Sequence, residues 1–230
     1  MALRRTFDRL NNRNATVGIF LIILLAIFAG PTLPRFFSDL IPFIDEGIPC
    51  EWVRPTDDRA NHQSLLGRSA ENPLRLRVQT TNLPSEPSGS LWVRIIVTNA
   101  SLGTVPFVYD PQSVVVGDGQ TAGLGLLFNP PTTLRSGNPL PASGSIPEQY
   151  IRVLGPRQTC VVTVAFAGSA VFNDPNLLSG TAQVRAYYSN PFNGQITIQP
   201  GAVATPIYGD QGLWTGRIES GPVTIPLGAS

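Results

Sequence analysis

Cys50 and Cys160 carry the clearest chemistry in this sequence, because they are its only cysteines. Two cysteines are too few for a four-cysteine zinc or iron–sulfur site, and without a C-x-x-C motif they do not indicate redox catalysis. A bridge between them would close a loop of roughly 110 residues and would persist in an oxidising compartment. The alternative is two buried free thiols. We predict a structural disulfide between Cys50 and Cys160.

The side chains that could support catalysis are sparse. His62 is the only histidine, so the chain has no multi-histidine metal site. Asp58 lies four residues before it, at the spacing that puts two side chains on one helical face. No G-x-S-x-G motif supplies a serine nucleophile for such a pair, so a polar surface histidine is the simpler interpretation. We predict no catalytic residue, no cofactor and no enzymatic activity; an envelope hydrolase with an unrecognised site is the least favoured alternative.

Acidic side chains in turns form a second group of candidates, because oxygen ligands in loops can bind calcium. The D-x-[DN]-x-[DN]-G calcium loop is absent, however, and aspartate favours turns for local reasons as well. The sequence therefore predicts no metal site. The turn acids are Asp110, Asp118, Asp174 and Asp210.

Aromatic side chains could instead form a platform for carbohydrate. Tyr187 and Tyr188 are consecutive in a predicted strand, so one should face the core and the other the surface. Packing in the core and at its rim is the alternative, because aromatics make up only 8% of the chain. An anchored module that binds carbohydrate or another envelope polymer is therefore the alternative function. The candidate platform residues are Trp52, Tyr187, Tyr188, Phe192 and Trp214.

The charge composition argues against nucleic acid as a partner. The chain has 16 basic and 15 acidic residues, a net charge of +1, and only 13% charged residues, about half the usual fraction. A nucleic-acid-binding surface needs a strongly basic field. All the basic residues are arginines, and they are unevenly placed. Residues 1–13 hold four arginines and one aspartate, a net charge of +3, and the remaining 12 arginines and 14 acids give −2.

Residues 14–34 form an uncharged run of 21 residues. As a helix the run would span about 31 Å, the thickness of the hydrocarbon core of a bilayer. We predict one transmembrane helix here. A cleaved signal peptide is the alternative, and it is disfavoured because neither Ala29 nor Gly30 has a small residue two positions before it. The apolar centre of the run consists of Val17, Ile19, Phe20, Leu21, Ile22, Ile23, Leu24, Leu25, Ile27 and Phe28.

The uneven charge predicts the orientation of this anchor. By the positive-inside rule, the basic tail 1–13 should stay in the cytoplasm and the chain after the helix should be exported. The predicted location is therefore the cell membrane, with a single pass and an extracytoplasmic C-terminal domain, either periplasmic or at the cell surface.

Residues 35–69 would then be a juxtamembrane foot and linker, with a short helix over 57–67. Apolar residues at its start repeat at helical spacing. They could lie in the membrane interface or dock on a neighbouring membrane protein; packing beneath the domain is the alternative. These candidate interface residues are Phe36, Phe37, Leu40, Ile41 and Phe43.

Residues 70–230 are predicted to form one all-β domain. Short runs rich in β-branched residues, or alternating between apolar and polar, are separated by turn sequences such as Gly-Asp-Gly and Asn-Pro-Pro. Their spacing predicts a β-sandwich or small barrel of roughly seven to ten strands. The Pro/Gly/Ser-rich loop 129–148 is either a mobile insert or a binding loop. The predicted strands are 74–80, 90–98, 105–109, 113–116, 123–128, 150–154, 158–166, 181–188, 195–199 and 223–227.

Three segments resemble parts of bacterial extracytoplasmic immunoglobulin-like domains. Residues 154–164 (LGPRQTCVVTV) resemble a turn and the strand after it, residues 180–188 (GTAQVRAYY) the penultimate long strand, and residues 216–225 (GRIESGPVTI) the closing strand. The resemblance implies an immunoglobulin-like β-sandwich over about residues 74–227, behind an N-terminal signal anchor. It departs from antibody domains in lacking their Cys…Trp…Cys framework, because Cys50 precedes the first sandwich strand. It implies adhesion, assembly or ligand binding, although a fold alone does not define a function.

Together these observations predict a membrane-anchored structural or interaction protein. It would be an envelope component or an accessory subunit of a larger membrane complex. Its partners would be the membrane itself and other proteins of the membrane or envelope.

Overall fold

The structure, a computed structural model, describes residues 47–53, 72–119, 121–135, 137–140, 144, 146–179, 182–192, 194 and 212–226. All of them lie in one compact unit, Glu46–Ser230. This unit is mostly β, as the sequence predicted. The predicted tail, transmembrane helix and foot, and the short helix over 57–67, lie outside the described residues. Among the described residues, no helix has the length and apolar character needed to cross a membrane.

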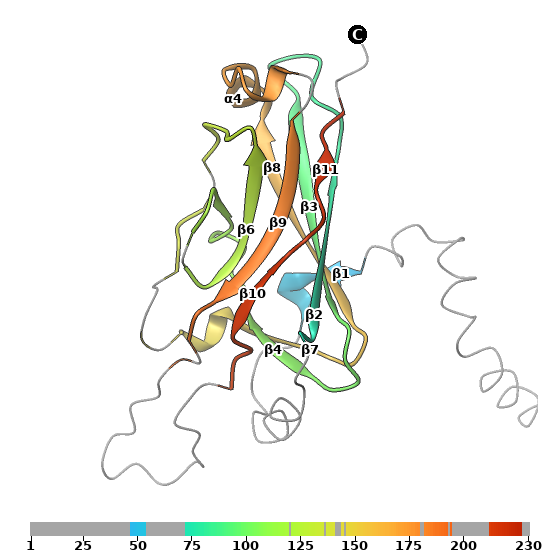
Figure 1. The fold of residues 1–230 in the computed structure, drawn as a ribbon, viewed down its shortest axis with the longest axis vertical. Helices are drawn as coiled ribbons and strands as arrows, with labels where there is room; N and C mark the ends of the chain where they lie inside the picture. Colours follow the sequence, from blue (N-terminus) through green and yellow to red (C-terminus); the bar gives the residue numbers. More distant parts are fainter. Residues whose placement is uncertain are drawn as a thin grey trace, which may run out of the picture. The chain divides into compact units, whose positions relative to one another are not determined.

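The first sheet has the strand order β1-β8-β3-β2 (Figure 1). Strand β3 pairs with both β2 and β8 in antiparallel fashion, and β1 pairs with β8 in parallel. In β2, Leu74, Leu76 and Val78 are buried and the arginines between them are exposed, which is the alternation that the sequence predicted. The bounds are β1 Ile48–Pro49, β2 Leu74–Thr80, β3 Ser90–Asn99 and β8 Thr159–Ala167.

The second sheet has the order β10-β9-β6-β5, and β11 also pairs with β9. Two further strands, β4 and β7, form a separate antiparallel ladder. The bounds are β4 Val105–Val108, β5 Val115–Val116, β6 Gly123–Asn129, β7 Ile151–Leu154, β9 Gln183–Asn190, β10 Gly216–Glu219 and β11 Val223–Thr224. The short helices are η1 Cys50–Trp52, η2 Glu148–Tyr150, α4 Gly168–Phe172 and η3 Leu177–Ser179.

The edge strand beside β9 is broken into β10 and β11 by one extra residue. Glu219 faces Tyr187 and Val223 faces Val184, so three residues on the edge (220–222) face only two on β9. The Ser220 amide still donates to the Ala186 carbonyl (2.8 Å), and the Ser220 hydroxyl accepts the Ala186 N–H (2.9 Å). The Ser220 hydroxyl thus takes the place of the backbone carbonyl that would accept the Ala186 N–H in a regular ladder. A bulge followed by proline also makes this edge a poor template for pairing with another strand.

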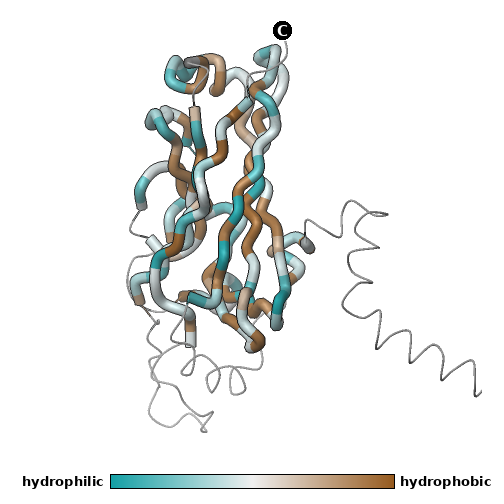
Figure 2. Tube along the Cα trace, turned by 45° about the vertical axis from the view of Figure 1, so that its right-hand side comes forward, coloured by the Kyte–Doolittle hydropathy of each residue, from teal (hydrophilic) through white to brown (hydrophobic). Residues whose placement is uncertain are grey.

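The inner rows of the two sheets share one core, and apolar and polar residues alternate along the strands (Figure 2). Tyr188 lies at its centre with no exposed surface, and its ring contacts those of Phe107 and Trp214. Its hydroxyl accepts the Val108 N–H (3.1 Å), so the one polar atom of the ring is paired. Burial raises the pKa of Tyr188 well above its usual value. This phenol is therefore a neutral core group.

Most predicted strands are present, and the differences are local. The closing strand is split by the bulge, and β11 ends at Thr224, short of the predicted 227. Strand β1 and the short helices were not predicted. The predicted strand 195–199 lies outside the described residues.

Candidate functional site

The predicted disulfide between Cys50 and Cys160 is confirmed. Both cysteines have no exposed surface, and their Cα atoms are 4.8 Å apart. Residues 47–53, which we call the β1 strap, lie along β8, with Ile48 opposite Cys160. Gly47 packs so closely that a Cβ there would lie 2.7 Å from the Thr159 carbonyl oxygen. The bond therefore fastens the chain just before the sandwich to a central strand of the first sheet.

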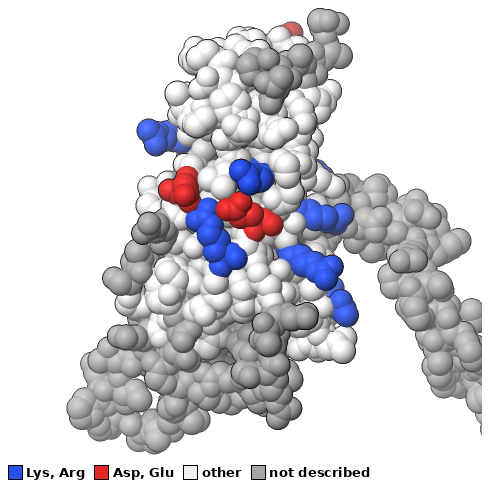
Figure 3. Space-filling model, in the orientation of Figure 1, with Lys and Arg blue, Asp and Glu red and all other residues white. Residues whose placement is uncertain are grey.

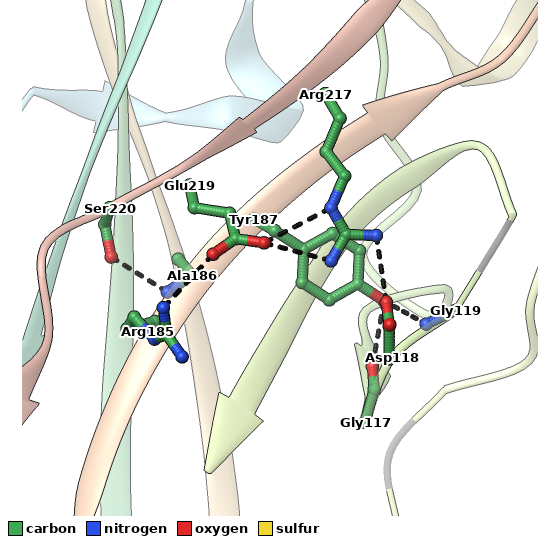
Figure 4. Close-up of polar contacts among 9 residues, drawn as sticks. All are labelled: Gly117, Asp118, Gly119, Arg185, Ala186, Tyr187, Arg217, Glu219 and Ser220. Carbon is green, nitrogen blue, oxygen red and sulfur yellow. Dashed lines mark hydrogen bonds and ion pairs between the residues drawn. The ribbon is translucent and has the colours of Figure 1, made fainter. Parts of the chain in front are cut away.

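A second cluster lies around Tyr187 and Arg217 on the outer face of the second sheet (Figure 4). There Tyr187 rests across Gly125. The Tyr187 hydroxyl donates to the Gly117 carbonyl (3.0 Å) and accepts the Gly119 N–H (3.1 Å). The Arg217 guanidinium carbon lies 4.7 Å from the centre of the ring. A Cβ on Gly125 would come within 2.2 Å of the ring, so glycine is required beneath it.

Ion pairs extend this cluster across the sheet. Arg217 pairs with Asp118 (2.9 Å) and Glu219 (3.1 Å), and Glu219 also accepts from Arg185 (3.4 Å). Burial alone would lower the pKa of Arg217, but the two carboxylates outweigh it and raise that pKa. We call these four residues and Tyr187 the Tyr187–Arg217 network. Figure 3 shows basic and acidic side chains gathered in a band across the middle of the face it draws.

The geometry of the network suits a structural role rather than a catalytic one. Three nitrogens of Arg217 already face carboxylates, and Tyr187 has only 1% of its surface exposed. Burial raises the pKa of Tyr187 and outweighs the hydrogen bond from the Gly119 N–H, which would lower it. The phenol is thus a hydrogen-bonding anchor for the turn at 117–119.

The predicted aromatic platform is not assembled. Tyr188 faces the core and Tyr187 the other side, as predicted, but the outward ring is covered. Phe192 and Trp214 are half-buried against the core. Trp52 is 72% exposed on the β1 strap. A tryptophan outside the predicted set, Trp92, is 46% exposed on the outer face of β3.

The turn acids have separate structural roles. Asp174 has no exposed surface, and its carboxylate accepts bonds from Thr132, from Thr133 (amide 2.7 Å) and from the Asn176 amide (3.0 Å). Burial would raise the pKa of Asp174, but these hydrogen bonds outweigh it and hold the pKa below its usual value. We call this arrangement the Asp174 clamp, because it ties the start of the predicted 129–148 loop to the turn after α4.

The other two turn acids that the structure describes do not join it. Asp110 accepts the Gln112 N–H (3.1 Å) within its own turn, and Asp118 belongs to the Tyr187–Arg217 network. Beside Asp110, burial first and Glu51 second raise the pKa of Tyr109 to about 12. Within the described part of the chain, no three His, Cys, Asp or Glu residues group in a way that could hold a metal ion. His62, Asp58 and Asp210 lie outside that part.

Sequence reasoning missed Arg217, Glu219 and Ser220. Arg217 and Glu219 are two apart in a strand, so they share a face, and that spacing was a usable signal for the pair. Nothing local indicates that Asp118 would reach the same arginine. Comparison with known proteins adds no relative: no protein-family model, curated protein or solved structure matches this chain.

Proposed function

We propose that this chain is a membrane-anchored structural or interaction protein, an envelope component or an accessory subunit of a larger membrane complex. The observation that carries the proposal is the Cys50–Cys160 disulfide. A buried structural disulfide is typical of exported domains, because the cytosol keeps thiols reduced. The bond begins 16 residues after the uncharged run that ends at residue 34. Export of the sandwich behind an uncleaved anchor accounts for both features.

The topology supports an immunoglobulin-like sandwich as part of this proposal. In such folds strands A, B and E lie in one sheet and C, F and G in the other. Strands β2, β3 and β8 correspond to A, B and E, and strands β6, β9 and β10 to C, F and G. Both their order along the chain and their neighbours in each sheet agree with that pattern. The β4–β7 ladder, the parallel β5 and the position of the disulfide depart from it. Domains of this architecture often present loops or an edge strand to other proteins, and we propose the same use here.

Binding of carbohydrate or another envelope polymer is the second candidate, and Trp92 favours it. Its side chain is 46% exposed and faces Ala165 across the strand pair, so a small neighbour leaves the ring accessible. A flat, accessible indole is the group on which a sugar ring stacks. Retention of the full chain on purified envelope polymer, lost in Trp92→Ala, would favour this function; equal retention of both would exclude Trp92 as the contact.

Mild detergent extraction of the full chain tests the leading proposal. We expect other membrane or envelope proteins to co-purify at fixed stoichiometry through sizing. Phe36→Ser together with Phe37→Ser should reduce that association if the foot contributes to docking. A chain that elutes only as a monomer, under conditions that preserve other membrane complexes, would contradict the subunit role.

A further inference from the structure

One end of the sandwich combines a rigid turn with an unusually exposed leucine. Leu102, between β3 and β4, is 79% exposed, the highest value among the large apolar side chains that the structure describes. Single exposed leucines are common and need no explanation on their own. The surroundings of this one are different, because the turn that carries it is fixed from beneath.

Asn99 fixes the turn. It has no exposed surface, and its side-chain N–H groups donate to the carbonyls of Gly103 (2.6 Å), Leu154 (3.2 Å) and Gly155 (2.8 Å). Its side-chain oxygen accepts the amide (2.9 Å) and hydroxyl (2.7 Å) of Ser101. One buried side chain therefore binds the β3–β4 turn to the β7–β8 turn. Three of these bonds, to Ser101 and Gly103, hold the β3–β4 turn, which still projects Leu102 into solvent.

A positive charge lies beside the leucine turn. Arg157, in the β7–β8 turn, is exposed and adopts φ 57°, a left-handed conformation that costs about 1 kcal/mol for a residue with a side chain. Its amide donates to the Ser101 carbonyl (3.2 Å), so the two turns are joined at this point as well. An exposed leucine and an exposed arginine on two joined turns are suited to an anionic lipid interface.

The direction of β1 shows at which end the chain enters the sandwich. Because β1 runs parallel to β8, the chain arrives at Gly47 against Thr159, the first residue of β8. Thr159 faces Thr98 across the strand pair, directly below the two turns. The chain therefore enters the sandwich at the end that carries these two turns, and the far end of β8 is about 27 Å further away.

We infer that the Leu102–Arg157 end of the sandwich rests on the bilayer, with Leu102 in the interfacial region and Arg157 beside anionic headgroups. This inference rests on the proposed anchor. It assigns the opposite end, with α4 and η3, to solvent and to partners.

Site-directed spin labels on the full chain in vesicles test the contact. Leu102→Cys carries one label and Leu178→Cys, at the opposite end and 45% exposed, is the matched control. Both native cysteines are in the disulfide, so each variant offers one thiol. In vesicles of phosphatidylcholine with a minority of phosphatidylglycerol, we expect oxygen accessibility relative to a water-soluble nickel complex to be several-fold higher at 102 than at 178.

The outcomes separate the two proposals. If the chain fails to float with the vesicles after a salt wash, the anchor fails and the contact fails with it. If it floats and both labels stay equally aqueous, the anchor survives and the contact is overturned, leaving a protein partner as the occupant of Leu102. Arg157→Gln should reduce the lipid signature at 102 when phosphatidylglycerol is present, whereas Arg135→Gln, an exposed arginine near the Asp174 clamp, should not.

Discussion

The two sheets hold remote chain segments in place by different means. On the first sheet, the β1 strap is fixed to β8 by a disulfide that is fully buried. On the second sheet, the turn at 117–119 is held by the Tyr187–Arg217 network, and the segment after β6 by the Asp174 clamp, all through polar contacts. We therefore expect the disulfide to respond to reductant, and the polar contacts to respond to pH and salt. The disulfide lies where the chain that follows the proposed anchor enters the sandwich.

Removing the disulfide should have the largest effect on stability. Cys50→Ala with Cys160→Ala releases a loop of roughly 110 residues in the unfolded state, which should lower the free energy of unfolding by about 4–5 kcal/mol. Urea unfolding of oxidised wild type, reduced wild type and the double variant measures it. The reduced wild type should behave like the variant. A loss below about 1 kcal/mol would mean that the β1 strap is held by its packing alone.

The Asp174 clamp should come second. Asp174→Asn leaves buried donors without a full set of acceptors and should cost about 3 kcal/mol. Because the pKa of Asp174 is lowered on folding, its contribution is fully present above the pKa of the unfolded chain and is lost as pH falls through the folded value. Acid unfolding followed by circular dichroism should show wild type losing its advantage over Asp174→Asn below about pH 4. A constant difference at all pH values would contradict the clamp.

Crowding the ring of Tyr187 should have an intermediate effect. Gly125→Ala places a methyl group where the ring lies and should cost about 2 kcal/mol by overpacking. Gly221→Ala is the matched control, because no atom lies within 4 Å of its added Cβ. Thermal unfolding of the two variants compares them directly. Equal midpoints would mean that Tyr187 does not rest on Gly125.

The ion pairs should matter least. Arg217→Gln should cost about 0.5 kcal/mol at low salt, since exposed pairs contribute little, and less at high salt. Arg77→Gln, an exposed arginine on β2 for which the described residues provide no ion pair, is the control. Urea midpoints at two ionic strengths test this. A salt-independent loss would assign the role of Arg217 to its packing on the ring.

The sequence predicted what depends on local pattern and missed what depends on distant contacts. The alternation in 74–80 and the β-branched run in 90–98 fix β2 and β3 almost to the residue, because one buried face requires that period. The bulge at Ser220 was missed because it forms only where a hydroxyl meets the Ala186 N–H of another strand. Strand β1 was missed because two residues, one of them proline, carry no periodicity.

The same distinction applies to the site. The disulfide was predictable because only two cysteines exist, so a single pairing was available. The covering of Tyr187 was not, because the arginine that lies over it comes from β10 and the glycine beneath it from β6. Alternation along β9 placed the ring outward but could not say what else would lie on that face.

The central claim is that a disulfide-bonded sandwich is exported behind an uncleaved anchor. Its most direct measurement is the thiol state of the full chain in carbonate-washed membranes, quenched with an alkylating agent and then denatured. We predict that the chain is in the membrane fraction with no alkylated cysteine before reduction and two after it. Two alkylated cysteines without reductant, or recovery of the chain in the soluble fraction, would contradict the claim.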